Sequence, residues 1–244
     1  MEDESGAELR WRQEAGAGDA DAAFHLANLL YERGELDEAE RWTRQAAEAG
    51  NASAAFNLGN LLRKRAERES AALLSFPGYA HRTELLEAER WYTQAASAVI
   101  VDALVNLGAI HYERGELEEA ERCLRPAAQA GTTEAFVNLG TVLYARRKRE
   151  EAEQWFKRAA DETGDTFAAF NVGVILEERG RGEEAEEWYR RAAEAGNSHA
   201  QLNLGSRYYH HGDLDAAEFW WWKAAAGGAA EANHNLRVLR ERRY

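Results

Sequence analysis

The chain has 244 residues, of which 45% are hydrophobic and 30% are charged, so it is apolar enough to fold around a sizeable core. Its formal net charge of −13 argues against a nucleic-acid binder, because such proteins rely on Lys and Arg contacts with phosphates. One cysteine, Cys123, precludes an internal disulfide and suits a reducing compartment. No segment approaches the roughly 18 apolar residues of a membrane span, and the acidic start does not resemble a signal peptide. We therefore expect a cytoplasmic protein.

Similar helical segments follow one another along the chain at a nearly constant period. The first reads AFHLANLLYERGELDEAERWTRQAAEAG, which indicates two amphipathic helices separated by a glycine. A period of this length predicts a helical solenoid, and we expect one domain over residues 1–244, with capping helices at 1–17 and 230–244. The predicted repeats are residues 20–51, 52–100, 101–132, 133–165, 166–197 and 198–229.

The third repeat shows the predicted boundaries, with helices at Val101–Glu113 and Leu117–Ala130. Gly115 and Gly131 follow these helices at places that suit a left-handed terminating residue. Two repeats depart from this pattern. Repeat two ends at residues 98–100 without glycine, and repeat four has Arg147 in place of the glycine, so its turn is less well defined.

Repeat two also carries an insertion within residues 66–83. It contains the apolar run Leu73–Phe76 and then Pro77-Gly78, a turn signal. We expect it to extend the first helix of the repeat and then fold back. Such an insertion either contributes a binding surface or covers an imperfect junction between repeats.

Three small or aromatic positions recur in the repeats. Glycine within a helix costs about 1 kcal/mol, which is tolerable where a neighbouring helix approaches closely. An alanine in the second helix is expected to supply a matching small contact, and the tryptophan three residues later is interpreted as core rather than as a cofactor site. The glycines are Gly59, Gly108, Gly140, Gly173 and Gly205; the alanines are Ala39, Ala88, Ala120, Ala152, Ala185 and Ala217; the tryptophans are Trp42, Trp91, Trp155, Trp188 and Trp220, with Cys123 at this position in repeat three.

An asparagine recurs at one position of the first helix, which packing alone does not explain. A side-chain amide offers a donor and an acceptor that match the backbone of an extended peptide. The alternative is that these amides bond to adjacent helices and hold the stack together. The series comprises Asn57, Asn106, Asn138, Asn171, Asn203 and Asn235.

These residues together resemble the tetratricopeptide repeat, and the ending Trp188-Tyr189 to Gly196 is similar to the Sel-like repeat. The resemblance implies an all-α, right-handed superhelix that acts as a protein–protein interaction scaffold, with the asparagine position on its concave face. It implies a peptide partner and no catalysis. The predicted peptide-binding residues are Asn57, Asn60, Asn106, Asn138, Asn171, Asn203, Phe24, Phe56, Tyr112, Tyr144 and Phe170.

The charge of this face limits the classes of ligand that we expect. Family members that grip an acidic C-terminus use lysines and arginines there, whereas only Arg63 and Lys64 are basic here. We therefore predict a neutral, apolar or basic segment as the partner. The acidic residues on the face are Asp21, Glu32, Asp102, Glu113, Glu134, Glu178 and Glu231.

No catalytic or metal-binding motif accompanies the repeats, so we expect no enzyme activity, no cofactor and no metal. The triplet Trp220-Trp221-Trp222 exceeds what one core position needs, and part of it is expected to face outward. Two other functions stay open. One is a self-assembling scaffold with an empty groove, and the other is a subunit that positions substrates for a separate enzyme.

Overall fold

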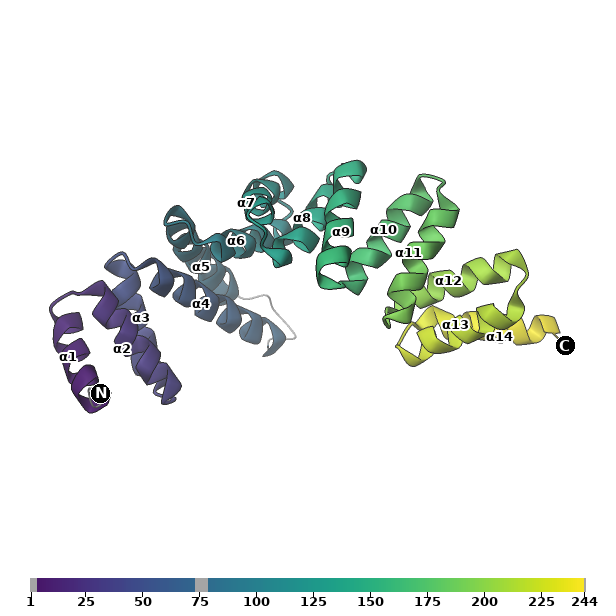
Figure 1. The fold of residues 1–244 in the computed structure, drawn as a ribbon. Helices are drawn as coiled ribbons and strands as arrows, with labels where there is room; N and C mark the ends of the chain where they lie inside the picture. The colour runs from purple at the N-terminus through teal and green to yellow at the C-terminus, as the bar shows by residue number, and fades with distance from the viewer. Residues whose placement is uncertain (1–3, 73–78, 244) are drawn as a thin grey trace. The chain divides into compact units, whose positions relative to one another are not determined.

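The structure, a computed structural model, describes residues 4–72 and 79–243, and every regular element in these ranges is an α-helix (Figure 1). None of the described helices is both long and apolar enough to cross a membrane. The helices are α1 (Glu4–Gly16), α2 (Ala20–Glu32), α3 (Leu36–Glu48), α4 (Ala52–Ala72), α5 (Tyr79–Ser97), α6 (Val101–Glu113), α7 (Leu117–Gln129), α8 (Thr133–Ala145), α9 (Arg149–Thr163), α10 (Thr166–Glu178), α11 (Gly182–Glu194), α12 (Ser198–His211), α13 (Leu214–Ala226) and α14 (Ala230–Arg243).

The helices confirm the predicted all-α architecture of helix pairs with single helices at the ends. The first helices of the repeats are α2, α4, α6, α8, α10 and α12, and each is followed by a second helix. The insertion in repeat two lengthens α4 to 21 residues and α5 to 19 residues. Its predicted apolar run and turn, residues 73–78, lie outside the described residues.

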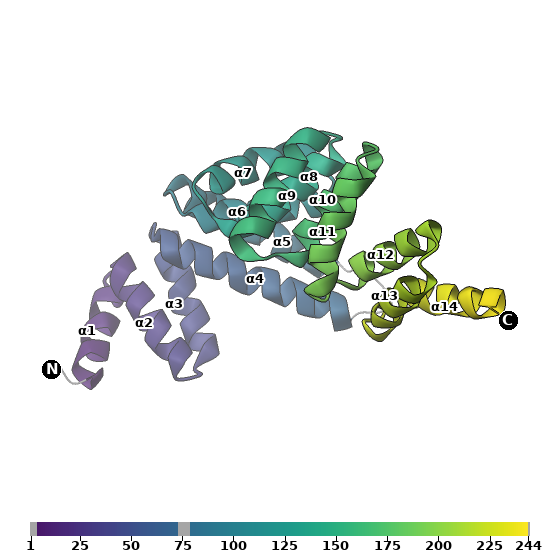
Figure 2. The same ribbon diagram turned by 45° about the vertical axis from the view of Figure 1, so that its right-hand side comes forward.

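The chain divides into two compact units, residues 1–132 and 133–244. In the N-terminal unit, consecutive helices from α1 to α7 pack on one another. In the C-terminal unit, α8 to α14 follow the same rule, and α12, α13 and α14 stay side by side in both ribbon views (Figure 2). Packing between neighbours in sequence is characteristic of repeat proteins, in which each repeat contacts only the next one.

Left-handed residues end most of the helices. Gly115 and Gly131 adopt φ angles of 76° and 92°, as the sequence predicts. Val99 and Arg147 stand at the corresponding places of repeats two and four and adopt the same conformation, with φ of 68° and 62°. The turn geometry is therefore kept without glycine, although a β-branched residue such as Val99 rarely adopts positive φ.

The glycines of the first helices let large side chains of the second helices approach closely. A β-carbon on Gly173 would lie 2.6 Å from the Tyr189 ring, and one on Gly140 would lie 2.8 Å from Phe156. The large side chain that packs against each of these glycines thus belongs to the residue directly after the tryptophan position. This residue forms the deepest layer of the core, whereas Trp42, Trp155 and Trp188 are only half-buried. The five glycine partners are Tyr92, Leu124, Phe156, Tyr189 and Trp221.

Candidate functional site

Two asparagines of the predicted site, Asn60 and Asn106, join successive first helices of the N-terminal unit. Asn60 Oδ1 accepts hydrogen bonds from the Tyr92 hydroxyl at 2.8 Å and from Asn106 Nδ2 at 3.1 Å. Asn106 Oδ1 accepts in turn from Arg63 Nη1 at 3.3 Å. These half-buried amides connect α4, α5 and α6, which is the structural role considered for the series.

The other asparagines differ from one another. Asn171 donates to the Phe167 carbonyl of its own helix at 2.7 Å. Asn203 forms a side-chain hydrogen bond with Tyr189 of the preceding helix. Within the described ranges, Asn57 and Asn138 form no hydrogen bond, and Asn57 is exposed. Their amides are therefore available to a ligand.

The predicted aromatic neighbours also divide into two groups. Phe56 and Phe170 are half-buried against core tyrosines, with ring centroids 6.0 Å from Tyr92 and 5.8 Å from Tyr189 respectively. Phe24 packs against the core of the N-terminal unit. Tyr112 is 41% exposed. The remaining one, Tyr144, donates a hydrogen bond of 2.5 Å to Glu178, which also binds Arg149 at 2.6 Å.

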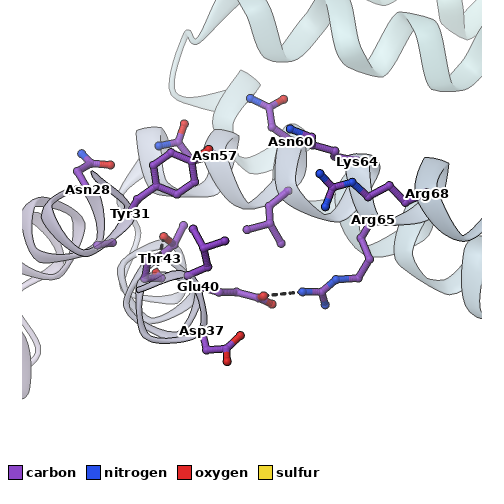
Figure 3. Close-up of a pocket in the computed structure, with 14 residues that line it drawn as sticks. Asn28, Tyr31, Asp37, Glu40, Thr43, Asn57, Asn60, Lys64, Arg65 and Arg68 are labelled. Carbon is purple, nitrogen blue, oxygen red and sulfur yellow. Dashed lines mark hydrogen bonds and ion pairs between the residues drawn. The ribbon is translucent and has the colours of Figure 1, made fainter. Parts of the chain in front are cut away.

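A pocket of about 710 Å³ lies between α2, α3 and α4 in the N-terminal unit (Figure 3). It brings Asn57 and Asn60 of the predicted site together with Asn28 and with the exposed side chains of Tyr31 and Leu36. The complete lining is Ala27, Asn28, Tyr31, Leu36, Asp37, Ala39, Glu40, Thr43, Asn57, Asn60, Leu61, Lys64, Arg65 and Arg68.

The pocket exists where repeat one departs from the other repeats. Ala27 stands at the glycine position of the first helix, and Thr43 stands at the position that Tyr92 occupies in repeat two. Both residues line the pocket. A β-carbon at the glycine position would come within 2.4–2.8 Å of the large side chain in five repeats, so alanine and threonine here form a compensating pair. The sequence alone could have indicated this pocket, because Thr43 is the only small residue at its position in the six repeats.

One end of the pocket is basic. Arg65 donates to Glu40 at 2.6 Å, and Figure 3 shows Lys64 and Arg68 on the same helix beside this pair. In the described part of the chain, Lys64 and Arg68 form no ion pair. The acidic Glu113 of the predicted face lies 3.3 Å from Arg63, which reduces the negative charge near α4.

The C-terminal unit exposes part of its tryptophan triplet, as predicted. Trp220 and Trp221 are 9% and 4% exposed, whereas Trp222 is 65% exposed. Trp222 borders an open hollow of about 570 Å³ between α13 and α14, together with Leu236, Arg237 and Arg240. Across the residues that the structure describes, no three His, Cys, Asp or Glu side chains gather as metal ligands would.

Family models match much of the chain between residues 20 and 228. One model described as a tetratricopeptide repeat matches residues 105–165 and 168–200, and a second matches residues 20–45. A Sel1 repeat model matches residues 78–98 and 198–228. No curated protein matches the sequence.

Several solved structures share the fold. One is c5321, described as a protective antigen of uropathogenic Escherichia coli with an SLR fold. It aligns with a TM-score of 0.67 and 26% sequence identity, and the alignment covers 96% of this chain and 52% of that one. The chain thus spans about half of that structure. Another is pilF of Pseudomonas aeruginosa, with a TM-score of 0.65, 21% identity, and coverage of 90% of this chain and 96% of that one. A repeat protein of Cytophaga hutchinsonii aligns with a TM-score of 0.62 and 14% identity over 95% of this chain and 93% of its own.

The helix pairs, the glycine contacts and the family matches agree with one another. The chain belongs to the tetratricopeptide and Sel1 repeat proteins.

Proposed function

We propose that the chain is a non-catalytic, cytoplasmic scaffold that holds an extended segment of another protein against the first helices of its repeats. Tetratricopeptide and Sel1 repeats form protein–protein interaction scaffolds. The observation that carries the proposal is the pocket between α2, α3 and α4, where the amides of Asn28 and Asn57 have no partner among the described residues. Free amides beside apolar side chains suit a peptide backbone.

The asparagines of the predicted site serve two purposes under this proposal. Asn60, Asn106 and Asn203 bond within the protein and support the stack of helices. Asn57 and Asn138 supply contacts to the ligand. Each hydrogen bond contributes only about 0.5–1.5 kcal/mol net, while micromolar affinity needs about 8 kcal/mol. Apolar contacts must therefore add most of the affinity, and Tyr31 and Leu36, 64% and 57% exposed, offer such contacts in the pocket.

The bound segment is proposed to be neutral, apolar or basic. The net charge of −13 repels an acidic segment over most of the surface. The basic end of the pocket, with Lys64 and Arg68, is a local exception to this field. Binding of matched acidic and basic peptides at low salt tests the preference, and tighter binding of the acidic series would contradict it.

A pull-down from cell lysate with quantitative mass spectrometry tests the proposal. It compares wild type with Asn28→Ala/Asn57→Ala, which removes the unbonded amides of the pocket. Asn171→Ala/Asn203→Ala is the matched control, because it removes bonded amides in the C-terminal unit, away from the pocket. A partner lost with the first variant and kept with the second, both folded by circular dichroism, supports binding at the pocket. Equal recovery with wild type and Asn28→Ala/Asn57→Ala would overturn it.

Self-assembly is a second candidate that one observation favours. Phe219 and Trp222 are 52% and 65% exposed on α13, and exposed aromatic patches mark interaction sites. Light scattering checks this function, because a self-assembling scaffold has a mass that is a multiple of 27.4 kDa. Trp222→Ser should then restore the monomer, whereas a monomeric wild type would exclude this candidate.

A further inference from the structure

We propose that the pocket between α2, α3 and α4 binds an aromatic side chain of the partner, with tyrosine preferred over phenylalanine. The inference rests on the proposed function and specifies the ligand at the same site. It follows from a comparison of repeat one with repeats two and five, which place a tyrosine of their own at the corresponding position.

Repeat two shows how the position is normally filled. The Tyr92 ring lies against Gly59, where a β-carbon would be only 2.7 Å away, and its hydroxyl donates to Asn60 Oδ1. Asn106 of the next first helix completes the group through its bond to Asn60. A phenol ring is thus held against the first helix of its own repeat, and its hydroxyl donates to a side-chain amide that also bonds to the next first helix.

Repeat five repeats the arrangement with different polar partners. The Tyr189 ring lies against Gly173, and its hydroxyl donates to Glu177 at 2.8 Å. Asn203 of the next first helix, at the position of Asn106, bonds to the same tyrosine. The position therefore accepts a phenol in two separate repeats, which is a property of the repeat geometry.

Repeat one keeps the polar partners but lacks the ring. Asn28 corresponds to Asn60, and Asn57 corresponds to Asn106, by their places in the aligned repeats. Thr43 replaces the tyrosine, and its hydroxyl donates to the Ala39 carbonyl of its own helix. In the described residues, the amides of Asn28 and Asn57 have no hydrogen-bond partner, although both line the pocket. Figure 3 shows them on the same side as Tyr31.

The pocket offers both kinds of contact that a tyrosine needs. Leu36, Leu61 and Tyr31 supply apolar surface for the ring, and the two free amides supply a donor and an acceptor for its hydroxyl. A volume of about 710 Å³ leaves room for the ring and adjacent backbone of a peptide. A neutral phenol also enters without the cost of desolvating a charge.

Selection from a random peptide library displayed on phage tests the inference on three forms of the full chain. These are wild type, Ala27→Gly/Thr43→Tyr, and Ala27→Gly alone. The double variant restores the glycine–tyrosine pair of repeats two and five and fills the pocket from within. The single variant is the matched control, because it changes the same helix and leaves the pocket open. Thermal unfolding establishes that all three are folded.

We expect wild type and Ala27→Gly to enrich peptides with a shared tyrosine or phenylalanine, and the double variant to lose them. Tyrosine-to-phenylalanine replacement in a selected peptide should weaken binding roughly three- to tenfold, since one hydrogen bond is lost. Enriched peptides without a shared aromatic residue, bound equally by the double variant but not by Asn28→Ala/Asn57→Ala, would overturn the inference and leave the proposed function intact. Enrichment on none of the three forms would count against both.

Discussion

The Tyr92 hydroxyl lies 2.8 Å from Asn60 Oδ1, which also accepts from Asn106 Nδ2 at 3.1 Å. A single amide oxygen thus joins three helices of the N-terminal unit. Asn57, one turn before Asn60 on the same helix, has no such bond among the described residues. Residues that look equivalent in the sequence therefore differ in their energetic roles.

Such a difference in bonding predicts unequal effects of alanine on stability at two positions of the series. Asn106→Ala removes the bond to Asn60 and leaves Arg63 without its amide partner, so we expect a loss of about 1–3 kcal/mol in unfolding free energy. Asn138→Ala removes an amide without a described partner and should change stability by less than about 0.5 kcal/mol. Urea unfolding measures both values, and equal effects would refute the assignment of roles.

Glycine at position 99 should stabilise the protein. Val99 is 82% exposed and holds a φ of 68°, a conformation that costs a β-branched residue about 1–2 kcal/mol. Val99→Gly relieves this strain without loss of core contacts, so we expect a gain of about 1 kcal/mol and a melting temperature about 2–4 °C higher. Val99→Ala is the control, because alanine keeps most of the strain. A melting temperature lower than that of wild type would contradict the strain argument.

Alanine in place of Gly173 should destabilise the C-terminal unit, even though alanine is the better helix former. The added β-carbon would lie 2.6 Å from the buried Tyr189 ring. Overpacking of this kind costs about 1–3 kcal/mol, and the gain in helix propensity returns about 1 kcal/mol. A double-mutant cycle with Tyr189→Thr, which imitates the Ala27–Thr43 pair, should show favourable coupling. Additive effects would mean that the two positions do not compensate each other.

Stability should fall in alkaline solution because two tyrosines are buried. Burial is the main cause that raises the pKa of both Tyr92 and Tyr189, and for Tyr189 the bond to Glu177 adds to it. Because the pKa is higher in the folded state, the two tyrosines contribute fully to the free energy of unfolding below the ordinary pKa of about 10. This contribution is lost as the pH rises above that value. The midpoint of urea unfolding, measured from pH 8 to alkaline pH, should decline less steeply for Tyr92→Phe/Tyr189→Phe. An unchanged slope would contradict this origin.

Much of the fold follows from the sequence because local signals agree with it. The helix predicted at Val101–Glu113 has these same bounds, and the next helix ends one residue before the predicted Ala130. Capping adds to this agreement, since Asp165 and Asn197 accept from the backbone N–H three residues later at the starts of α10 and α12. The turns at Val99 and Arg147 were harder to predict, because residues other than glycine rarely adopt the left-handed conformation that both hold.

The candidate site was only partly accessible to sequence reasoning. The pattern shows that asparagine recurs, but not that Asn60 and Asn106 bond to each other across helices. That bond depends on the spacing and rotation of α4 and α6. The pocket is present because Thr43 stands where the other repeats have a large side chain. A pattern of recurring residues does not reveal such an exception.

Packing mainly between helices that are neighbours in sequence, within each of the two units, has a consequence for how the chain folds and opens. Such a topology has a low contact order, so folding closes only short loops and is expected to be fast. Among the described helices, α1 packs mainly on α2, and α14 packs mainly on α13. Each of these helices can detach while the rest stays intact, so their amide hydrogens should exchange with solvent before those of α4 or α10. Unfolding is then expected to begin by fraying at α1 and α14, and a ligand that bridges two neighbouring repeats should slow it locally.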